Sequence, residues 1–499
     1  MDTRPSTSLY FSASLRQIEA AHARDKLMGR AGAAAADWAR QLLAGKPAPV
    51  LVLAGPGNNG GDALEMAAEL RRQGIAVQLV FKGRAENLPA DARQAHARFI
   101  EQGGSCLEQI PPGTEFGLIV DGLFGIGLTR PLEGEYAELV RAANKLARHL
   151  RCPLLALDCP SGLDADSGFC RGVAIQASHT LSFIAGKPGL YTADGPDCCG
   201  EIRIHDLGLG GTLQQVADGA LVQPEDFRHC LQPRRRNSHK GSHGSVGIIG
   251  GAHSMIGAPL LAGRAALKLG AGRVFLGLLD PQAPGVDFVQ PELMLRKPEG
   301  IFDAELTALA CGPGLGRSVH AAELLERALA THVPLVLDAD ALNILAFEEG
   351  LQAAICKRRA PVLLTPHPAE AARLLDLAAA DIQQDRIHMA QALARRYRAW
   401  VALKGCGTVI ADPEGCWWIN TSGNPGLASA GSGDVLTGLL AALLGQGWPI
   451  TEALLAACHL HGQAADQLVR EGIGPVGMCA GEIADAARQC LNQWLAAAS

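Results

Sequence analysis

A glycine-rich segment in the second half of the chain has the residues best suited to chemistry. Residues 424–434 read NPGLASAGSGD and lead into the apolar run VLTGLLAALL at 435–444. We predict a small-residue loop followed by a helix, whose first backbone N–H groups lack partners within the helix and can bind an anion. Asp434 places a carboxylate beside that anion, as proton removal from a hydroxyl next to a phosphate requires. The alternative is that Asp434 only caps the helix.

Other glycine-rich turns in this half follow predicted strands. Lys404 opens the sequence KGCGT, which offers backbone amides, an ammonium group and a hydroxyl to a nucleotide phosphate. His367 lies between two prolines in TPHPAE, where the restricted backbone favours a rigid turn and therefore a substrate contact. Lys240 in KGSHG either meets a phosphate or lies in solvent. His459 and His461 are two residues apart on a predicted helix, so they face different ways and do not predict a metal site.

The first half has oxygen-bearing side chains at the ends of three predicted strands. Residues 51–62 read LVLAGPGNNGGD, a strand, a glycine turn and a helix start that allow close approach of a phosphate but do not match G-x-G-x-x-G. Two later strands end at Asp121 and Asp158. In an open α/β sheet such ends converge on one crevice. Each acid alone is equally well explained as the cap of a turn, but three together favour a shared site.

The same convergence predicts a cation site in the first half. Asn59, Asp121 and Ser161 would surround the ion with neutral and anionic oxygens. A donor set with many oxygens and few charges suits a weakly hydrated monovalent ion better than zinc, which prefers His and Cys.

Two tandem α/β folds are needed to position these motifs. At 499 residues the chain exceeds the ~250–300 residues that one core usually supports. Near-continuous apolar strands separated by helices predict parallel sheets covered on both faces. We predict a first domain at 1–215, a linker at 216–234 and a second domain at 235–499.

The first domain opens with a helical segment over 12–45. Its predicted strands are 49–54, 75–81, 118–121 and 153–158. The second domain has a predicted helix at 258–269 and another after Asp434, and the last two of its strands are expected to form a hairpin. These strands are predicted at 245–249, 273–278, 308–311, 333–338, 360–364, 400–403, 408–411 and 416–420.

Composition restricts the class of protein. Hydrophobic residues make up 48% and charged residues 19%, and the net charge of −6 argues against a nucleic-acid partner. The 14 cysteines are scattered, which is typical of reduced thiols in a cytosolic protein. Neither a membrane-length apolar run nor a secretion signal is evident. We expect a soluble, cytoplasmic protein without membrane partners, and the Gly- and Ala-rich helices leave a homo-oligomer open.

The first-half motifs GNNGGD, DGLFGIG and DCPSGLD, with FIAGKPGL at 183–190, resemble the N-terminal domain of NAD(P)H-hydrate epimerases over roughly residues 10–210. The resemblance implies a Rossmann-like fold, potassium held by Asn59, Asp121 and Ser161, and Asp158 as acid or base when C6 of the hydrated nicotinamide inverts. Ala63 replaces a usual Gly and is expected to crowd the nucleotide by at most one methyl group. Implied contacts to the hydrated nucleotide are Asn58, Asn59, Gly60, Gly61, Asp62, Gly125, Ile126, Gly127, Leu128, Thr129, Arg130, Pro131 and Asp158.

The second-half motifs KGSHG, GPGLG, TPHPAE, KGCGT and GSGDVLTG resemble, in this order over residues 235–495, the ribokinase-like ADP-dependent NAD(P)H-hydrate dehydratases. The resemblance implies a three-layer α/β fold and Asp434 as the base on the C6 hydroxyl. Magnesium is expected because a nucleotide phosphate is transferred. Implied substrate contacts are Ala258, Gly316, His367 and Asp434, and implied ADP or AMP contacts are Lys404, Gly405, Cys406, Gly407, Thr408 and Gly433.

Together the two resemblances predict a bifunctional repair enzyme. One domain would epimerise the R and S hydrates of NADH and NADPH, and the other would dehydrate the S form with ADP, giving AMP and phosphate. The alternative is a small-molecule kinase fused to a non-catalytic nucleotide-binding module. The motifs do not distinguish ADP from ATP, or the NADH hydrate from the NADPH hydrate.

Overall fold

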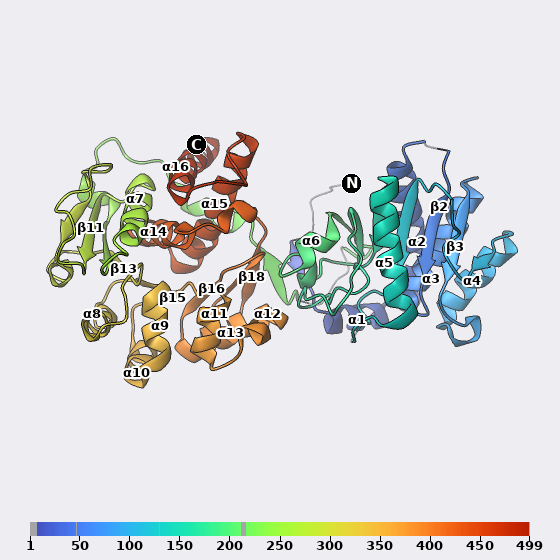
Figure 1. Ribbon diagram of the computed structural model, residues 1–499, viewed down its shortest axis with the longest axis horizontal. Helices are drawn as coiled ribbons and strands as arrows, with labels where there is room; N and C mark the ends of the chain where they lie inside the picture. Colours follow the sequence, from blue (N-terminus) through green and yellow to red (C-terminus); the bar gives the residue numbers. More distant parts are fainter. Residues whose placement is uncertain (1–6, 46, 129, 211–215, 499) are drawn as a thin grey trace. The chain divides into compact units, whose positions relative to one another are not determined.

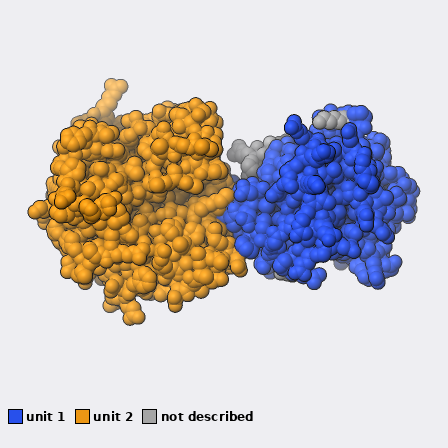
Figure 2. Space-filling model, viewed as in Figure 1, with its two compact units in different colours: residues 1–220 blue, residues 221–499 orange. Residues whose placement is uncertain are grey.

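The computed structural model describes residues 7–45, 47–128, 130–210 and 216–498. The chain forms two compact units, Met1–Ala220 and Leu221–Ser499 (Figure 2). Both are α/β folds built on predominantly parallel sheets, as the apolar strand pattern predicts. Among the described residues, no helix has both the length and the apolar character needed to cross a membrane.

The sheet of the first unit is parallel throughout. Its strand order is β4-β3-β2-β5-β6-β7-β8. Every residue of β2, β5 and β6 is buried, as expected for strands covered on both faces. The bounds are β2 (Val50–Ala54), β3 (Val77–Phe81), β4 (Cys106–Leu107), β5 (Leu118–Gly122), β6 (Leu154–Leu157), β7 (His179–Phe183) and β8 (Glu201–His205).

Alternate residues of β2 divide the first unit's core into two layers. Val50 and Val52 pack with α2 and α3, whereas Leu51 and Leu53 pack with α5 (Figure 1). The helical segment predicted at 12–45 is two helices, because the chain leaves the helix after Ala21 and Lys26 adopts a left-handed conformation. The helices are α1 (Ser12–Ala21), α2 (Leu27–Leu43), α3 (Asn58–Arg72), α4 (Ala90–Glu101), α5 (Gly134–Leu150) and α6 (Gly195–Cys199).

The sheet of the second unit has the order β18-β17-β16-β15-β14-β13-β10-β11-β12. Pairing is parallel from β12 to β16 and antiparallel from β16 to β18, which confirms the predicted hairpin. Separately, β1 (Ser8–Leu9) pairs antiparallel with β9 (Gly219–Leu221). The strands are β10 (Ser245–Gly250), β11 (Arg273–Leu278), β12 (Met294–Arg296), β13 (Ala308–Cys311), β14 (Leu335–Leu337), β15 (Val362–Leu364), β16 (Trp400–Leu403), β17 (Thr408–Ala411) and β18 (Trp417–Asn420).

A large apolar cluster joins one face of this sheet to α7, α14, α15 and α16 (Figure 1). The predicted loop ending at Asp434 is shorter than expected, since the helix already begins at Ser432 and Asp434 lies in its first turn. The helices are α7 (Gly257–Lys268), α8 (Val319–Leu329), α9 (Ala339–Phe347), α10 (Glu349–Lys357), α11 (Pro368–Leu375), α12 (Ala379–Gln384), α13 (Arg386–Tyr397), α14 (Ser432–Gly445), α15 (Ile450–Arg470) and α16 (Ala480–Ala498).

Close packing of α14 on α7 depends on Gly438. A Cβ atom at this position would lie 2.1 Å from the carbonyl oxygen of Ala262. No side chain fits there, so only a glycine allows the observed separation of the two helices. This contact also sets the position of the first turn of α14.

We expect Gly438→Ala to lower the free energy of unfolding by ~1–3 kcal/mol, because the added methyl overpacks the contact between α14 and α7. Gly350→Ala is the matched control, since Gly350 is also helical but has open space around its Cβ position. That substitution should be neutral or stabilise by up to about 1 kcal/mol. Urea denaturation measures both, and equal effects would contradict the packing role of Gly438.

Candidate functional sites

A pocket of the first unit has a volume of about 700 Å³ and lies at the carboxyl ends of β2, β5 and β6. Loops after these strands form one side, and further lining residues come from α1, α2, α3, α4 and the end of β7. Its lining includes Arg16, Glu19, Ala20, Ala23, Leu27, Met28, Ala31, Pro56, Gly57, Asn58, Asn59, Asp62, Asp91, Leu123, Phe124, Gly125, Ile126, Gly127, Asp158, Phe183, Ile184 and Leu207.

The predicted glycine turn at the start of α3 has two separate roles. Asn58, Asn59 and Asp62 line the pocket. Gly60 and Gly61 are not among its lining residues and pack inward instead. A Cβ atom on Gly60 would lie 1.9 Å from the carbonyl oxygen of Gly55, and one on Gly61 would lie 2.6 Å from the side chain of Met28. These two glycines therefore allow close packing beneath the pocket.

Part of the second predicted loop reaches the same pocket. Gly125, Ile126 and Gly127 line it, whereas Leu128, Arg130 and Pro131 are not among its lining residues. Thr129 lies outside the described residues. The methyl of Ala63 faces Gly122 in β5 rather than the pocket, since a Cβ atom on Gly122 would lie 2.4 Å from it.

Asp158 is held at the pocket by Lys187 of the FIAGKPGL segment, a residue to which the sequence analysis assigned no role. One Asp158 oxygen lies 2.7 Å from Nζ of Lys187, whose side chain is 1% exposed. The Lys187 ammonium also donates to Ser182 Oγ at 2.7 Å and to the carbonyl of Phe183 at 3.1 Å. The other Asp158 oxygen accepts from the amide of Ile126 at 3.4 Å. Asp158 has a φ of 64°, an unfavourable conformation that this network maintains.

Two further carboxyl groups face Asp158. Burial raises the pKa of Asp62, and the charges of Asp158 and Glu19 raise it further. Burial also raises the pKa of Glu19, again with a contribution from Asp158. The pocket thus combines a lysine-paired carboxylate with two carboxyl groups that hold a proton more readily than usual. Glu19 lies on α1, where no motif marks it.

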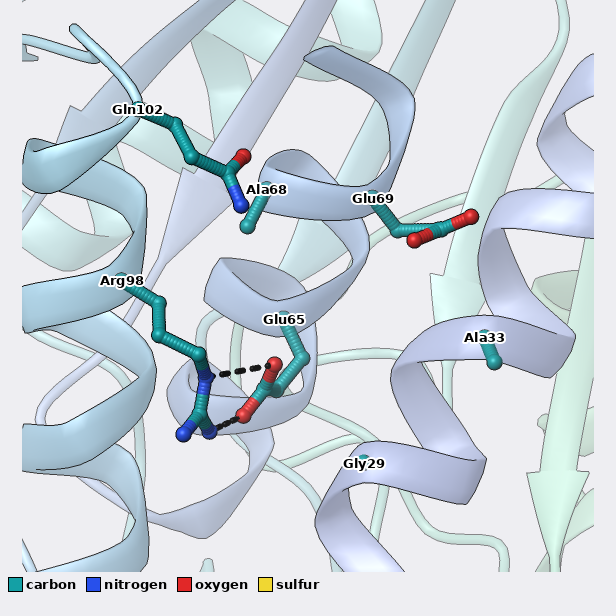
Figure 3. A pocket seen from close by; sticks show the side chains of 7 residues that line it. All are labelled: Gly29, Ala33, Glu65, Ala68, Glu69, Arg98 and Gln102. Carbon is teal, nitrogen blue, oxygen red and sulfur yellow. Dashed lines mark hydrogen bonds and ion pairs between the residues drawn. The ribbon is translucent and has the colours of Figure 1, made fainter. Parts of the chain in front are cut away.

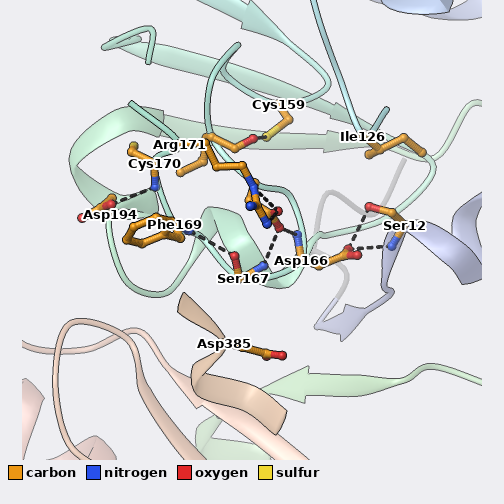
Figure 4. Close-up of polar contacts among 12 residues, drawn as sticks. Ser12, Ile126, Cys159, Asp166, Ser167, Phe169, Cys170, Arg171, Asp194 and Asp385 are labelled. Atoms are coloured by element: carbon orange, nitrogen blue, oxygen red, sulfur yellow. Dashed lines mark hydrogen bonds and ion pairs between the residues drawn. The ribbon is translucent and has the colours of Figure 1, made fainter. Parts of the chain in front are cut away.

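Polar contacts fix the helix that presents Glu19. Both the backbone amide and the hydroxyl of Ser12, at the start of α1, donate to Asp166, at 2.7 and 2.8 Å (Figure 4). In the same segment Arg171 pairs with Asp164 at 3.0 Å, and Asp194 accepts from the amide of Cys170 at 2.9 Å. The loop that follows Ser161 therefore anchors α1.

The predicted cation ligands gather beside this pocket. Asp121 is fully buried and accepts from both the amide and the hydroxyl of Ser161, at 2.8 and 2.7 Å. It also accepts from the amide of Leu123 at 3.2 Å, so it caps a turn as well. Ser161 Oγ in turn accepts from the amide of Phe124 at 2.9 Å. Burial raises the pKa of Asp121 to about 6.

Asn59 supplies the observation that favours a cation. Both polar atoms of its side-chain amide are buried and have no hydrogen-bond partner within the described part of the chain. The amide lies beside Gly125, where a Cβ atom would be 3.4 Å from Asn59 Cγ. Among the described residues, no group of three or more His, Cys, Asp and Glu is arranged to bind a metal. A mixed oxygen set at Asn59, Asp121 and Ser161 fits a monovalent cation better than a transition metal.

A second, smaller depression of about 150 Å³ lies among α2, α3 and α4 (Figure 3). Arg98 pairs there with Glu65 across two helices. Its lining residues include none of the predicted site residues.

In the second unit, Lys404 and Asp434 lie close to each other at the first turn of α14. A Cβ atom on Gly433 would lie 3.4 Å from Lys404 Nζ. Gly431 is the N-cap, and the helix has no side-chain cap, so Asp434 does not fill the capping role that was the alternative. Burial raises the pKa of Asp434 to about 6; Asp338 adds to this shift and Lys404 opposes it.

The other substrate-contact candidates lie in three further turns of the second unit. Gly316 donates its amide to Asp340 at 2.9 Å, and Asp340 also influences the pKa of Asp434. Ala258 lies in the first turn of α7, beside Gly314 of the GPGLG turn. His367 is the N-cap of α11, where its Nδ1 accepts from the amide of Ala369 at 3.1 Å.

The predicted nucleotide loop follows β16. The amide of Lys404 donates to Pro366 at 2.9 Å, which joins this loop to the His367 turn. Gly405 and Gly407 have φ angles of 145° and 60°, which favour glycine. Thr408 donates its hydroxyl to the Gly405 carbonyl at 3.1 Å. The exposed Cys406 completes the loop.

Arg386, which lies outside every sequence motif, supports this loop from behind. Its guanidinium is 1% exposed and donates to the carbonyls of Leu403 and Lys404 at 3.0 and 3.3 Å.

Lys240 is exposed in a short 3-10 segment. His461 contacts Ser432 at 3.3 Å, whereas His459 packs with Phe227 and Trp494, so these two histidines do not share a site.

Comparisons with known proteins cover both units. Residues 24–189 match the family model described as the YjeF-related protein N-terminus, and residues 246–488 match that of NAD(P)H-hydrate dehydratase. Bifunctional NAD(P)H-hydrate repair enzymes from Coxiella burnetii and Escherichia coli are 36% and 37% identical to this chain. The first match covers 97% of this chain and 100% of its relative, and the second covers 89% and 85%.

A solved structure also resembles part of the chain. It is an ADP/ATP-dependent NAD(P)H-hydrate dehydratase from Bacillus subtilis, co-crystallized with ATP and Mg²⁺. Its sequence is 30% identical, the match covers 55% of this chain and 98% of that structure, and the TM-score is 0.49.

We expect Lys187→Met to destabilise the first unit by about 3 kcal/mol or more, because the substitution leaves Asp158 without its buried cation. Lys82→Met is the matched control: Lys82 pairs at 3.0 Å with Glu135, which is 78% exposed, so its loss should cost less than about 1 kcal/mol. Urea denaturation of the full chain, with hydrogen exchange of peptides from β6 and β7, measures both. Equally small effects would contradict the proposed dependence of Asp158 on Lys187.

Proposed function

Since this chain belongs to the family of bifunctional NAD(P)H-hydrate repair enzymes, we propose that each unit performs one of the two repair reactions. The first unit interconverts the R and S hydrates of NADH and NADPH, and the second dehydrates the S hydrate with ADP. The observation that supports this assignment is that each unit holds a carboxylate beside a lysine at the carboxyl edge of its sheet. Asp158 lies beside Lys187, and Asp434 lies near Lys404.

The first pocket is suited to inversion at C6 of the hydrated ring. The lone pair of the adjacent ring nitrogen assists cleavage of the C6–O bond, and the hydroxyl leaves as water once it is protonated. Water then adds to the opposite face of the planar carbon and loses a proton. Asp158 exchanges these protons with the substrate, while the Gly125–Gly127 loop, which lines the pocket, contacts the substrate.

The second site is suited to phosphoryl transfer followed by elimination. Asp434 accepts the proton of the C6 hydroxyl as its oxygen forms a bond to the β-phosphorus of ADP, and AMP leaves. Phosphate then departs from C6 with the electron pair of the C–O bond, and loss of the C5 proton restores the reduced nicotinamide. Lys404 and the first-turn amides of α14 offset the negative charge of the phosphate.

Two ions complete the proposal. Asn59, Asp121 and Ser161 would hold potassium, whose charge would order the loop from Gly122 to Gly125 and neutralise the buried Asp121. Magnesium would bind with the diphosphate of ADP and offset its charge during transfer.

Potassium should stabilise the first unit against unfolding by ~1–3 kcal/mol relative to tetramethylammonium at equal ionic strength. Because the pKa of Asp121 is about 6 and the cation binds the carboxylate, this gain should fade as the pH falls below 6. Calorimetry of the full chain measures it. Asn59→Ala should abolish the gain.

Asn144→Ala is the matched control for the potassium site. Asn144 is also buried, but its amide donates to Ala174 and accepts from Gln176, both at 2.9 Å. This variant should be less stable yet respond normally to potassium. A normal response in Asn59→Ala would exclude Asn59 as a ligand.

A mixture of R and S NADH hydrate should regain all its reduced-nicotinamide absorbance when the protein, ADP, magnesium and potassium are present. Asp158→Asn should recover only the S fraction, with the remainder limited by spontaneous epimerisation. Asp434→Asn should slow recovery by at least about 100-fold, because the base is lost. ATP in place of ADP tests the nucleotide preference.

Two results of this assay would contradict the proposal. A stable phosphorylated product without reduced nicotinamide would identify the second unit as a kinase. Recovery of only the S fraction by the unaltered protein would identify the first unit as a non-catalytic module.

A further inference from the structure

A buried carboxylate in the second unit has no part in the steps of phosphoryl transfer and elimination. Asp338 follows β14 and is 2% exposed. It occupies the N-cap position of α9, but its side chain makes no cap hydrogen bond to that helix. A carboxylate this deeply buried requires other partners, because desolvation disfavours its charge.

Those partners come from two separate elements of the site. One oxygen of Asp338 lies 2.7 Å from Nζ of Lys404, at the end of β16. The other accepts a 2.7 Å hydrogen bond from the hydroxyl of Thr437, which lies one turn after Asp434 in α14. Asp338 therefore joins the start of the nucleotide loop to the helix that bears the proposed base.

This bridge determines where the charge of Lys404 lies. Its Nζ is directed to Asp338 beneath Gly433, which places a full positive charge at the N-terminal turn of α14. The N-terminal end of the helix dipole adds a partial positive charge there. Burial disfavours the ammonium, but the charges of Asp338 and then Glu370 outweigh burial and raise the pKa of Lys404. The cation is thus fixed before any anion arrives.

Asp338 also contributes to the field at Asp434. Burial, Asp338, Lys404 and Asp340 act on the Asp434 carboxyl, and the two neighbouring carboxylates favour its protonated form. From α15, His461 reaches the same turn through Ser432, but burial lowers the pKa of His461 to about 4, so it is neutral near pH 7.

We propose that Asp338 is a positioning residue of the dehydratase site: its two oxygens fix the ammonium of Lys404 at the first turn of α14 and place a negative charge close to the proposed base, Asp434. This inference rests on the proposed function, because it concerns the same nucleotide loop and the same base. A purely structural ion pair would account for the stability of the fold but would leave the pH profile of the reaction unchanged.

Asp338→Asn provides the test, since it preserves size and removes the charge. Asp434 must be ionised to accept a proton, so the rate falls as the pH drops below its pKa. Removal of the Asp338 charge lowers that pKa, and the acid limb of kcat should move down by about one pH unit. The KM for ADP should rise at least about tenfold, because Lys404 is no longer held in place.

Asp287→Asn is the matched control. Asp287 is 4% exposed in the same unit and pairs with Arg264 at 2.7 Å, away from the nucleotide loop. Its loss should lower the stability of the unit while the acid limb and the KM for ADP stay unchanged. Epimerase activity of each preparation reports the integrity of the first unit.

Asp338→Glu separates the charge from the geometry and remains available if Asp338→Asn does not fold. It should keep the acid limb close to that of the unaltered protein but raise the KM for ADP. The inference is overturned if Asp338→Asn retains the original acid limb and KM, or, where only Asp338→Glu folds, if that variant keeps the original KM. If the unaltered protein shows no nucleotide-dependent dehydration, the proposed function itself fails, which is a different result.

Discussion

A lysine–carboxylate ion pair with one almost fully buried partner is the interaction on which both proposed sites depend. Charges with so little exposure persist only in pairs, because desolvation of either ion alone costs several kcal/mol. In the first unit the pair contains the proposed acid or base itself, Asp158 with Lys187. In the second unit the pair is Lys404 with Asp338, and Asp434 stands beside it. The pair in the first unit holds a carboxylate in position, and the pair in the second unit holds a cation that can bind a phosphate.

Parallel sheets explain why these pairs form at one edge of each fold. Strands that are buried on both faces cannot present charged residues along their length, so polar groups gather where the strands end. The helices that follow these strand ends must also pack closely against neighbouring backbone. Gly60 and Gly438 serve that purpose, since a Cβ atom on either would lie about 2 Å from a carbonyl oxygen. The close contacts that these glycines allow therefore also set the position of the site residues.

Local pattern was sufficient to predict most strands, because an uninterrupted apolar run such as residues 400–403 or 408–411 has few alternatives. The pattern did not predict the helix boundaries that depend on backbone conformation. The left-handed Lys26 separates α1 from α2, and the helix at Asp434 begins two residues before that carboxylate. Partners distant in sequence were also missed: Lys404 meets Asp338 across 66 positions, and no local pattern encodes which buried side chains share a cavity.

The central claim is that each unit carries a complete site for its own reaction. Mixing the full-length Asp158→Asn and Asp434→Asn proteins tests it most directly, with recovery of reduced nicotinamide from an R and S hydrate mixture as the readout. The account predicts that the mixture recovers both epimers with ADP, since one protein supplies an intact epimerase unit and the other an intact dehydratase unit. Recovery that stops at the S fraction would contradict it.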